Sequence, residues 1–520
     1  MALARTHSIA LAGVQGHVVE IEADIENGLV ALLLVGLPDT ALREARDRIR
    51  SAIVNSQQSW PQRRITVGLS PASLPKRGSG FDLAIAVAIL SADGVVNDEA
   101  LAGTVFLGEL GLDGRIRPVP GVLPSVAAAA AAGFGRTVVA AENAAEAALV
   151  PGMRIVAAAT LSGLLGWLRD GDPDVPGWDV QIVDSGAGLA ASAPAGAGMS
   201  PHGDLADVVG QPVARRAAEI CAAGGHHMLL LGPPGVGKTM LAERLPGIMP
   251  PLEPPAALEV SAIHSVAGAL KPDRPLVTEP PFCAPHHTAT KAAIVGGGSG
   301  VIRPGAASLA HHGCLFLDEA PEFDRDVLDA LRQPLESGEV VVARSGLTAR
   351  FPARFTLILA ANPCPCARST AGGSHCTCTP LVRRRYLARL SGPLLDRVDV
   401  KVDLLPVGRA ELLSDRQLAE PSATVAARVR EARLRAAARL RDTRWRLNAE
   451  VPGSELRRSF RPEPGALAPL ELAMDRGQVS ARGADRIIRM SWTLADLASR
   501  PRPRLAEVGA ALGLWLGTGL

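Results

Sequence analysis

One segment in the middle of the chain has the residue types and spacing needed to bind a nucleoside triphosphate. An apolar run over residues 228–231 precedes Gly232, and after four residues come Gly237, Lys238 and Thr239. Glycines let backbone N–H groups wrap the phosphates, the lysine contacts the β- and γ-phosphates, and the threonine hydroxyl binds Mg²⁺. The predicted ATP-binding residues are Gly232, Pro233, Pro234, Gly235, Val236, Gly237, Lys238, Thr239 and Met240.

A second apolar run, about eighty residues later, ends in two acids within the sequence GCLFLDEAPEF. At the end of a buried strand, Asp318 could hold the Mg²⁺ ion and Glu319 could polarise the attacking water. The pair therefore predicts ATP hydrolysis rather than binding alone. The alternative, that both acids form surface ion pairs, does not account for the apolar strand before them.

Three more polar residues could complete a hydrolytic site. Asn362 closes a third apolar run and would reach the γ-phosphate or the water if its strand lay beside the other two. Arg397 follows an SGPLLD turn, and Arg482 opens a helical pattern. Arginine stabilises the charge on a γ-phosphoryl group in flight, and a neighbouring subunit often supplies it. Taken alone, each of the three would more often be a turn residue or a surface ion-pair partner.

These groups converge only if parallel strands deliver them to one edge of a sheet. With 520 residues, of which 47% are hydrophobic, the chain can form two to four domains. We expect an α/β domain at 1–172, a linker at 173–203, a P-loop α/β domain at 204–405 and a helical region at 406–520. The Ser-, Gly-, Ala- and Pro-rich linker cannot bury enough apolar surface to order itself. In the first domain the pattern predicts strands at 18–25, 31–38 and 63–71 and helices at 39–56 and 81–93.

Charge and hydropathy bound the classes of function. The net charge of +2 gives no overall field that would attract nucleic acid, so any basic surface must be local. No apolar run approaches the ~20 residues that span a bilayer, and the first residues lack the sustained apolar region of a signal peptide. We therefore expect a cytoplasmic protein with no membrane partner.

Several longer segments match a known family. They are GPPGVGKTMLAERLPGIMPPL, PHHTATKAAIVGGGSGVIRPGAASLAHHGCLFLDEAPEF, LRQPLESGEVVVARSG, NPCPC…CTCTP…SGPLLDRVDV and, nearer the amino terminus, VGLPDTALREARDRIRSAI, RRITVGLSPASLPKRGSGFDLAIA and FLGELGLDGRIRPVPGVLP. In these segments the chain resembles the magnesium-chelatase-type AAA+ proteins of the YifB/ComM family. The resemblance implies a Lon-protease-like amino-terminal domain, a P-loop core with a parallel sheet and helices on both faces, and a helical carboxyl-terminal lid.

The resemblance also implies roles for single residues. Asn362 matches the sensor-1 position, Arg397 the arginine finger and Arg482 the sensor-2 arginine, although Arg389 lies near enough to compete for the finger. In the Lon-like domain the nucleophile position falls at about Gly80, one place from Ser79, and the lysine position at about Leu123. Without a serine–lysine pair there is no activated nucleophile, so we expect this domain to be non-catalytic.

Well-understood members of this family are hexameric, ATP-driven DNA motors that promote branch migration during natural transformation. The resemblance therefore implies a homohexamer acting on single-stranded or branched DNA. The alternatives are a motor for metal insertion, as in magnesium chelatase itself, or another protein-remodelling role. An ATP-dependent protease and a nucleotide-gated scaffold without motor action are further candidates, and the missing serine–lysine pair disfavours the first.

Two local features could bind DNA. Eight arginines lie between residues 428 and 446, and helical spacing places Arg428, Arg435, Arg439 and Arg446 on one stripe. The alternative is a solvated helix face. Arg344 lies in a predicted hairpin, GEVVVARSGLTARF, which could project into a central pore or form an ordinary exposed turn. The glycine loop 296–300 could also face the pore, whereas the sequence assigns no role to the paired histidines His286 and His287.

Four cysteines cluster between residues 364 and 378. The spacing C-P-C, nine residues, C-T-C could provide a tetrahedral site for structural Zn²⁺, although C-x-C is less usual than C-x₂-C. Unliganded thiols are the alternative, and disulfides are disfavoured in a reducing cytosol. The possible zinc ligands are Cys364, Cys366, Cys376 and Cys378.

Overall fold

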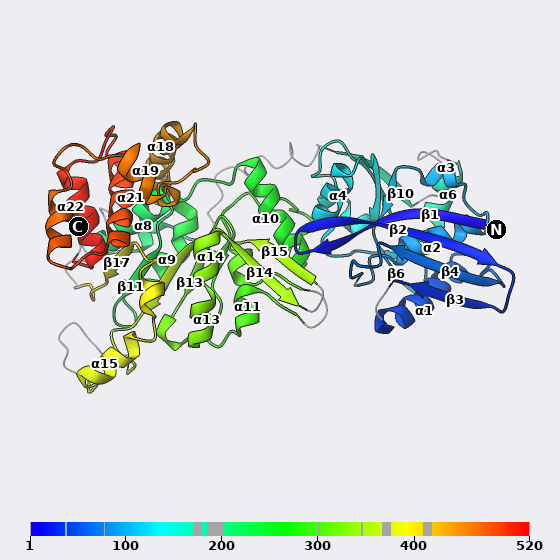
Figure 1. The fold of residues 1–520 in the computed structure, drawn as a ribbon, viewed down its shortest axis with the longest axis horizontal. Helices are drawn as coiled ribbons and strands as arrows, with labels where there is room; N and C mark the ends of the chain where they lie inside the picture. Colours follow the sequence, from blue (N-terminus) through cyan, green and yellow to red (C-terminus); the bar gives the residue numbers. More distant parts are fainter. Residues whose placement is uncertain are drawn as a thin grey trace.

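The computed structural model describes the chain in nine stretches. Its parts follow one another along the long axis of the molecule, from an amino-terminal α/β region through a central α/β region to a bundle of helices (Figure 1). Most of the predicted linker 173–203 lies outside the described residues. The described stretches are 2–36, 39–76, 78–170, 179–185, 202–298, 302–344, 347–366, 376–408 and 419–518.

The amino-terminal region is built on an eight-stranded mixed sheet in the order β10-β9-β8-β5-β1-β2-β4-β3. The three strands and two helices predicted from its sequence are present. The strands are β1 (Ala2–Ala12), β2 (Gln15–Glu26), β3 (Ala31–Val35), β4 (Arg64–Ser70), β5 (Thr104–Phe106), β8 (Arg136–Ala140), β9 (Arg154–Ala158) and β10 (Val180–Asp184). The main helices are α1 (Asp39–Asn55), α2 (Asp82–Ala92), α4 (Val122–Ala131) and α6 (Leu161–Asp170), with a short hairpin of β6 (Glu109–Leu110) and β7 (Ile116–Arg117).

The central region contains a parallel five-stranded sheet in the order β12-β13-β16-β11-β17. Every residue of β13 and β16 is buried, as expected for a parallel sheet covered on both faces. Because the strands are parallel, the residues that follow them meet at one edge of the sheet. The strands are β11 (Met228–Leu231), β12 (Phe282–Cys283), β13 (Cys314–Leu317), β16 (Thr356–Ala361) and β17 (Val400–Asp403).

Helices and one hairpin complete the central region. The hairpin pairs β14 (Glu339–Arg344) with β15 (Leu347–Pro352) in antiparallel register, as its sequence predicts. The helices are α8 (Pro212–Gly224), α9 (Lys238–Ile248), α10 (Pro254–Ala267), α11 (Lys291–Val295), α12 (Ala306–Leu309), α13 (Arg325–Ala330), α14 (Arg332–Ser337), α15 (Pro380–Leu387) and α16 (Gly392–Leu395).

The carboxyl-terminal region is helical, as predicted. Its helix α21 packs against α22, α18 and α8, and one buried cluster runs from Met228 in the sheet to Ile487 in α21. The helical region and the central sheet therefore share a core. The helices are α18 (Ser422–Leu440), α19 (Gly453–Arg458), α20 (Ala468–Asp475), α21 (Ala481–Leu497) and α22 (Leu505–Leu516). In the described part of the chain, no helix is both long and apolar enough to cross a bilayer.

The tip of the β1–β2 hairpin joins the amino-terminal region to the central region (Figure 1). Gly13 forms a backbone bridge with Arg350 of β15. Its φ of +72° and the overlap that a Cβ atom would make with the Arg350 carbonyl require glycine at this position. Beside it, Leu11 and Val14 pack against a small buried cluster that includes Phe351. The outer strand of the β14–β15 hairpin is thus fixed to the amino-terminal region.

A second contact joins α4 to α10. The backbone N–H of Gly121 donates to the carbonyl of Ser265 at 3.0 Å, and the Ser265 hydroxyl donates to Glu146. Glu146 also accepts from the backbone N–H of Leu123 at 2.8 Å. Burial raises the pKa of Glu146, against the hydrogen bonds that favour its carboxylate. This joint is polar and buried.

Candidate nucleotide-binding site

Lys238 lies at the start of α9, directly after the glycine loop that follows β11. Its Nζ atom donates to the carbonyls of Gly232 at 2.6 Å and Pro233 at 2.9 Å, and to Oδ1 of Asn362 at 3.0 Å. Gly235 and Gly237 have φ values of +78° and +95°, which L-residues rarely adopt. Burial lowers the pKa of Lys238, with Asp318 and Glu319 opposing this effect. The loop conformation leaves its N–H groups and an ammonium group at one helix N-terminus, which suits a phosphate chain.

The acids after β13 face the first turn of α9. The Thr239 hydroxyl donates to Oδ2 of Asp318 at 2.8 Å, while Oδ1 of Asp318 accepts from the backbone N–H of Glu319 at 2.9 Å. A hydroxyl and a carboxylate that already lie this close are oxygen ligands of the kind that Mg²⁺ prefers. Glu319 has φ +49° and ψ +43°, a conformation that is uncommon for a residue with a side chain and tends to occur at functional sites.

Asn362 follows β16, which lies between β13 and β11 in the sheet. The side chain is only 8% exposed and meets Lys238 from the neighbouring strand. Three adjacent strands thus bring Lys238, Asp318 and Asn362 to the same edge of the sheet. This convergence is the arrangement that the sequence pattern required.

Arg397 lies at the opposite end of the same sheet, where its strands begin. It precedes β17, whose residues Val400 and Asp403 pair in parallel with Met228 and Leu231 of β11. Four strand residues, at about 3.3 Å each, separate this edge from the glycine loop by about 13 Å. Since the two ends of the sheet cannot meet within one subunit, Arg397 cannot reach the nucleotide that its own Lys238 would hold.

Arg482 lies near Arg397, at the same end of the sheet. It is exposed in the first turn of α21, and burial together with repulsion from Arg332, Arg486 and Arg482 lowers the pKa of Arg397. The Arg397 guanidinium contacts Glu336 and the carbonyl of Pro393. The structure therefore groups the two arginines predicted to sense the γ-phosphate with each other, and it does not bring them to Lys238.

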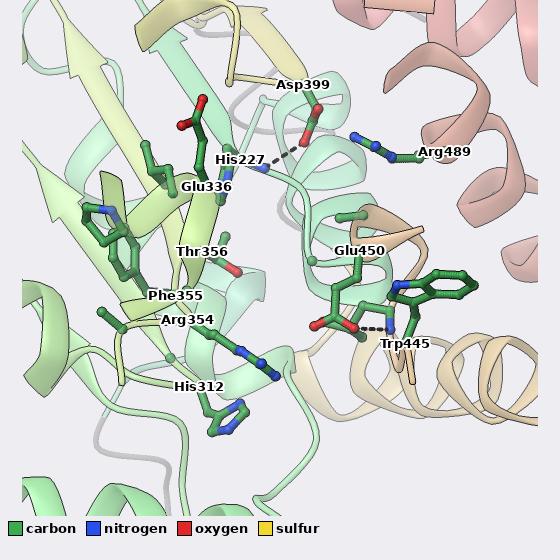
Figure 2. Close-up of a pocket in the computed structure, with 18 of the residues that line it drawn as sticks. His227, His312, Glu336, Arg354, Phe355, Thr356, Asp399, Trp445, Glu450 and Arg489 are labelled. Atoms are coloured by element: carbon green, nitrogen blue, oxygen red, sulfur yellow. Dashed lines mark hydrogen bonds between the residues drawn. The ribbon is translucent and has the colours of Figure 1, made fainter. Parts of the chain in front are cut away.

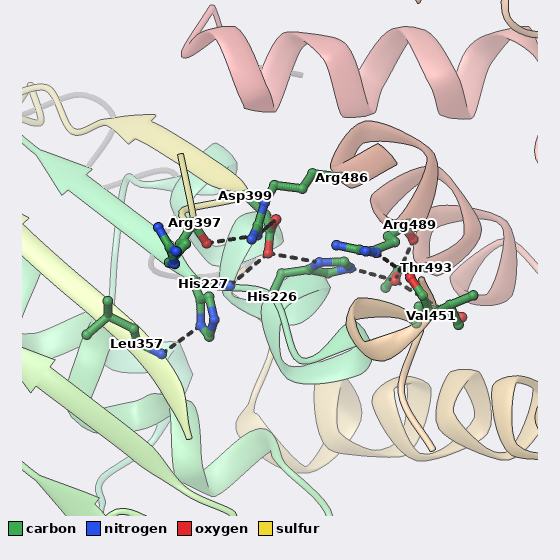
Figure 3. Close-up of polar contacts among 10 residues, drawn as sticks. His226, His227, Leu357, Arg397, Asp399, Val451, Arg486, Arg489 and Thr493 are labelled. Carbon is green, nitrogen blue, oxygen red and sulfur yellow. Dashed lines mark hydrogen bonds and ion pairs between the residues drawn. The ribbon is translucent and has the colours of Figure 1, made fainter. Parts of the chain in front are cut away.

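A buried network, which sequence reasoning missed, fixes the backbone at Arg397 (Figure 3). Arg486 Nη1 donates to the Arg397 carbonyl at 2.9 Å and to Asp399 Oδ1 at 2.6 Å. The other Asp399 oxygen accepts from the backbone N–H of His227 at 3.2 Å and lies 3.4 Å from His226 Nδ1. Although burial alone would raise it, these partners hold the pKa of Asp399 well below its usual range. The network ties α21 to the amino edge of the sheet.

A polar pocket of about 610 Å³ opens beside this network, between the sheet and the carboxyl-terminal helices (Figure 2). Its lining includes Arg354, Trp445, Glu450 and Arg489. Arg489 is held by the carbonyl of Val451 at 2.6 Å. The pocket lies at the amino edge of the strands, so it is separate from the loop that holds Lys238.

Arg389, the alternative finger, is engaged within its own subunit. Its Nη1 atom donates to the carbonyl of Pro321 at 3.0 Å and to Glu322 at 2.9 Å, in the turn that follows Glu319. The side chain is about half exposed. It braces the turn after the acids.

The arginine stripe of α18 that was predicted to bind DNA makes intramolecular contacts. Arg428 pairs with Glu219 and Glu420, and Arg435 pairs with Glu431 and the carbonyl of Asp496. Arg439 donates to both carboxylate oxygens of Asp496 and to Asn448, and it stacks over the ring of Trp492 at 4.3 Å. Two of the partner acids, Glu219 and Asp496, lie on the neighbouring helices α8 and α21. The three arginines are therefore engaged within the chain, and their contact with DNA stays a prediction.

Arg344 is the other predicted DNA contact. It ends β14, opposite Leu347, but its side chain lies outside the described residues. The glycine loop is described only from Gly296 to Gly298, where Gly297 pairs with Arg303.

The four cysteines converge. Cys364 Sγ lies 3.3 Å from Cys366 and 3.4 Å from Cys376, and the Cys366–Cys376 distance is 3.6 Å. Cys378 completes a group whose sulfurs all lie within 4.8 Å of one another, and all four are free thiols. Zn–S bonds of about 2.3 Å in a tetrahedron separate the sulfurs by about 3.8 Å. The group could therefore bind Zn²⁺.

A second trio, Glu259, His311 and His312, resembles a metal site but is better explained by hydrogen bonds. Nε2 of His311 and Nε2 of His312 lie 3.2 and 3.4 Å from Oε2 of Glu259. Nδ1 of His311 accepts from the backbone N–H of Arg354 at 2.9 Å, so the proton of a neutral ring sits on Nε2 and cannot make way for a metal. Hydrogen bonds from both histidines hold the pKa of Glu259 well below its usual range. The trio links α10 to the strand that carries Asp318.

The amino-terminal region has no serine–lysine pair among its described residues. The Ser79 hydroxyl donates to Glu109, and Leu123 is buried in α4. Lys76, the only lysine before residue 200, is fully buried and donates to the carbonyls of Leu69, at 3.0 Å, and Pro71. Its ammonium group is committed to the backbone.

Comparison with known proteins decides the family. Three family patterns match: "Subunit ChlI of Mg-chelatase" at residues 21–143, "Magnesium chelatase, subunit ChlI" at 204–412, and "Magnesium chelatase, subunit ChlI C-terminal" at 419–514. The competence protein ComM of Haemophilus influenzae is 40% identical over 513 residues, covering 98% of this chain and 97% of its own. The chain belongs to the YifB/ComM family of magnesium-chelatase-like proteins.

Other relatives in the YifB/ComM family are similar over comparable lengths. The protein YifB of Salmonella typhimurium is 41% identical over 498 residues, covering 96% of this chain and 94% of its own. A protein of Mycobacterium tuberculosis is 52% identical over 512 residues and covers 98% of both chains. The ChlI-type AAA domain implies that this YifB/ComM member is an ATPase that uses ATP and Mg²⁺.

Proposed function

We propose that this YifB/ComM protein is a ring-forming ATPase that converts hydrolysis into movement along DNA and promotes branch migration. The observation that carries the proposal is the position of Arg397 at the edge of the sheet opposite Lys238. A site that needs both residues is complete only between two copies of the chain. Oligomers are also typical of the ChlI family, and a closed homohexamer is the form that we propose.

In the proposed reaction, the loop ending at Lys238 binds the triphosphate, and Thr239 and Asp318 hold Mg²⁺. Magnesium neutralises charge on the β- and γ-phosphates when it is bound. Glu319 accepts a proton from the attacking water, and Asn362 orients the water or the γ-phosphate. Arg397 and Arg482 of the neighbouring subunit stabilise the charge of the transition state. The amino-terminal Lon-like domain contributes no hydrolysis of peptides.

Support for DNA as the partner comes from similarity and from one local element. A relative that shares 40% of its residues over the full length is named a competence protein. The β14–β15 hairpin precedes the strand of Asn362, and its tip, with Arg344, would face the pore of a ring. The hairpin is thus a candidate contact, beside the glycine loop 296–300 and the arginines of α18.

The experiment that tests this function is ATP-dependent branch migration on a synthetic three-way or four-way junction. The wild-type protein should migrate the junction, and Lys238→Ala should not. Stimulation of ATP turnover by branched DNA separates a DNA motor from the metal-insertion alternative. Turnover that responds to no DNA, together with an unmoved junction, would reject the DNA motor while leaving the ATPase intact.

We also propose that the four-cysteine group holds a structural Zn²⁺ ion. Cys364 lies two residues after Asn362, so a metal at this site would brace the loop that leaves the candidate ATP site. Cys364 is buried, and its group converges without disulfides in the described residues.

A further inference from the structure

The segment that follows the edge strand β12 places His287 beside Glu319. His287 Nδ1 lies 3.4 Å from Oε2 of Glu319. β12 pairs in parallel with β13, so the two segments leave the sheet at the same edge. Among the described residues, His287 is the only basic side chain that pairs with Glu319 within 4.0 Å. The function proposed above gives this histidine no role.

Local contacts hold the His287 segment in place. The ring of His286 lies 4.1 Å from the ring of His287, and its Nδ1 atom is 2.8 Å from the hydroxyl of Thr288. The backbone N–H of Ala289 donates to the His286 carbonyl at 2.9 Å. Thr290 then caps α11 by accepting from the N–H of Ala293 at 3.3 Å. Because the segment is fixed at both ends, the His287 side chain is held beside Glu319.

The Glu319 carboxylate has one oxygen engaged and one oxygen open. Its backbone is in the left-handed region, and its N–H is bound to Asp318, so the side chain alone can reorient. Oε2 faces His287, whereas Oε1 has no hydrogen-bond partner among the described residues. The side chain is 49% exposed, so packing does not fix the carboxylate. A base that must meet one water molecule gains from a second contact that fixes its orientation.

We propose that His287 is a positioning residue for the general base Glu319. Its Nδ1–H group holds Oε2, and Oε1 accepts the proton of the attacking water. The proton therefore moves from water to Glu319, and His287 neither gains nor loses one. This inference rests on the proposed ATP hydrolysis. In the described residues, no third potential ligand joins His286 and His287 in a three-ligand metal site, so a metal-binding role has no support.

The test compares three substitutions of His287 in the full chain. His287→Asn keeps an N–H donor close to the position of Nδ1, His287→Gln moves it outward to the position of Nε2, and His287→Ala removes it. We expect His287→Ala and His287→Gln to lower kcat about tenfold, a part of the 10²–10⁴ that a general base supplies. KM for ATP should stay within about twofold, since the phosphate contacts are unchanged. His287→Asn should recover most of the wild-type kcat.

Two controls separate positioning from folding. His286→Ala removes the neighbouring imidazole, which does not pair with Glu319, and should reduce kcat much less than His287→Ala. The double variant Glu319→Gln with His287→Ala should turn over no more slowly than Glu319→Gln alone, because His287 acts only through Glu319.

Each other outcome overturns the inference. An unchanged kcat in His287→Ala would show that the contact does not matter, and a raised kcat would show that it restrains the base. Equal loss in Asn and Gln variants, or a loss confined to KM, would assign His287 to structure. If wild-type protein bound ATP without hydrolysing it, the proposed ATPase would fail instead, which is a distinguishable result.

Discussion

The ammonium nitrogen of Lys238 lies 3.0 Å from the side-chain oxygen of Asn362, a residue 124 positions later in the chain. The contact joins the helix after β11 to the end of β16, two adjacent parallel strands. Since phosphates would compete with Asn362 for this lysine, nucleotide binding would free the Asn362 amide to face the γ-phosphate. Lys238 and Asn362 are thus coupled before any ligand enters.

Glu319→Gln should bind ATP with near wild-type affinity and lose about 10²–10⁴ in hydrolysis rate, because the amide cannot accept the water proton. Binding of a fluorescent ATP analogue and steady-state phosphate release provide the two measurements. Normal turnover by this variant would contradict the assignment of the general base.

Arg397→Ala should be inactive alone and partly rescued by mixing with Lys238→Ala. Mixed assemblies contain interfaces in which an intact P-loop meets an intact arginine, because the two residues lie at opposite edges of the sheet. ATP turnover is measured across mixing ratios, with each variant alone as the control. If no ratio restored activity, Arg397 would not act between subunits.

Asp399→Asn should destabilise the protein by about 3–5 kcal/mol, since it leaves Arg486 without its partner in a buried network. Asp442→Asn is the matched control, because its pair with Arg441 is almost fully exposed and should contribute little. Calorimetry of the unfolding transition compares the two. Equal stabilities would mean that the network does not hold α21 to the sheet.

The same pair gives a pH dependence with a definite sign. The pKa of Asp399 is lower in the folded protein than in the unfolded chain, so its contribution is fully present above the unfolded value of about 3.9. It is lost as the pH falls through the folded pKa. The difference in stability between wild type and Asp399→Asn should therefore be constant near neutral pH and shrink in strong acid.

Protein purified without chelator should contain about one Zn²⁺ per chain, because the four converging thiols could form a tetrahedral site. Cys364→Ser should lower the metal content and the thermal stability of the loop, whereas Cys221→Ser, which alters a buried cysteine outside the cluster, should leave the metal content unchanged. Elemental analysis measures the metal content of both variants, and thermal unfolding measures their stability. Substoichiometric zinc after gentle purification would end the zinc proposal.

Gly13→Val should loosen the joint between the amino-terminal region and β15. A side chain there meets the Arg350 backbone in a left-handed conformation, which costs about 2 kcal/mol or more. Gly80→Ala is the control, because its Cβ would meet open space. Hydrogen exchange in β15 should rise in Gly13→Val alone. Unchanged protection would show that the hairpin does not depend on this contact.

The candidate ATP site could be predicted because its chemistry is local in sequence. Glycine spacing, apolar strands and the residues that end them determine which groups face a phosphate, and the parallel sheet brings them together. The contact between Lys238 and Asn362 required only that their strands be adjacent.

Long-range pairing was harder to predict. No strand was predicted at residues 2–12, which form β1 in the middle of the sheet and pair not only with the adjacent β2 but also with β5, about a hundred residues later. Nothing near Arg486 in the sequence distinguishes it from the other arginines of its region, because its partner Asp399 lies 87 residues away. The acids that pair with the arginines of α18, such as Glu219 and Asp496, are likewise distant in sequence.

The opposite placement of Lys238 and Arg397 has a consequence for how catalytic capacity grows with assembly. A head-to-tail row of n subunits has n − 1 junctions and leaves one P-loop without an arginine from a neighbouring subunit, whereas a ring of n subunits has n junctions. An isolated subunit has none. On dilution, ATP turnover should therefore fall abruptly rather than gradually. A gap in the ring, such as one opened to admit a DNA strand, would inactivate one ATP site while the others continue to hydrolyse ATP.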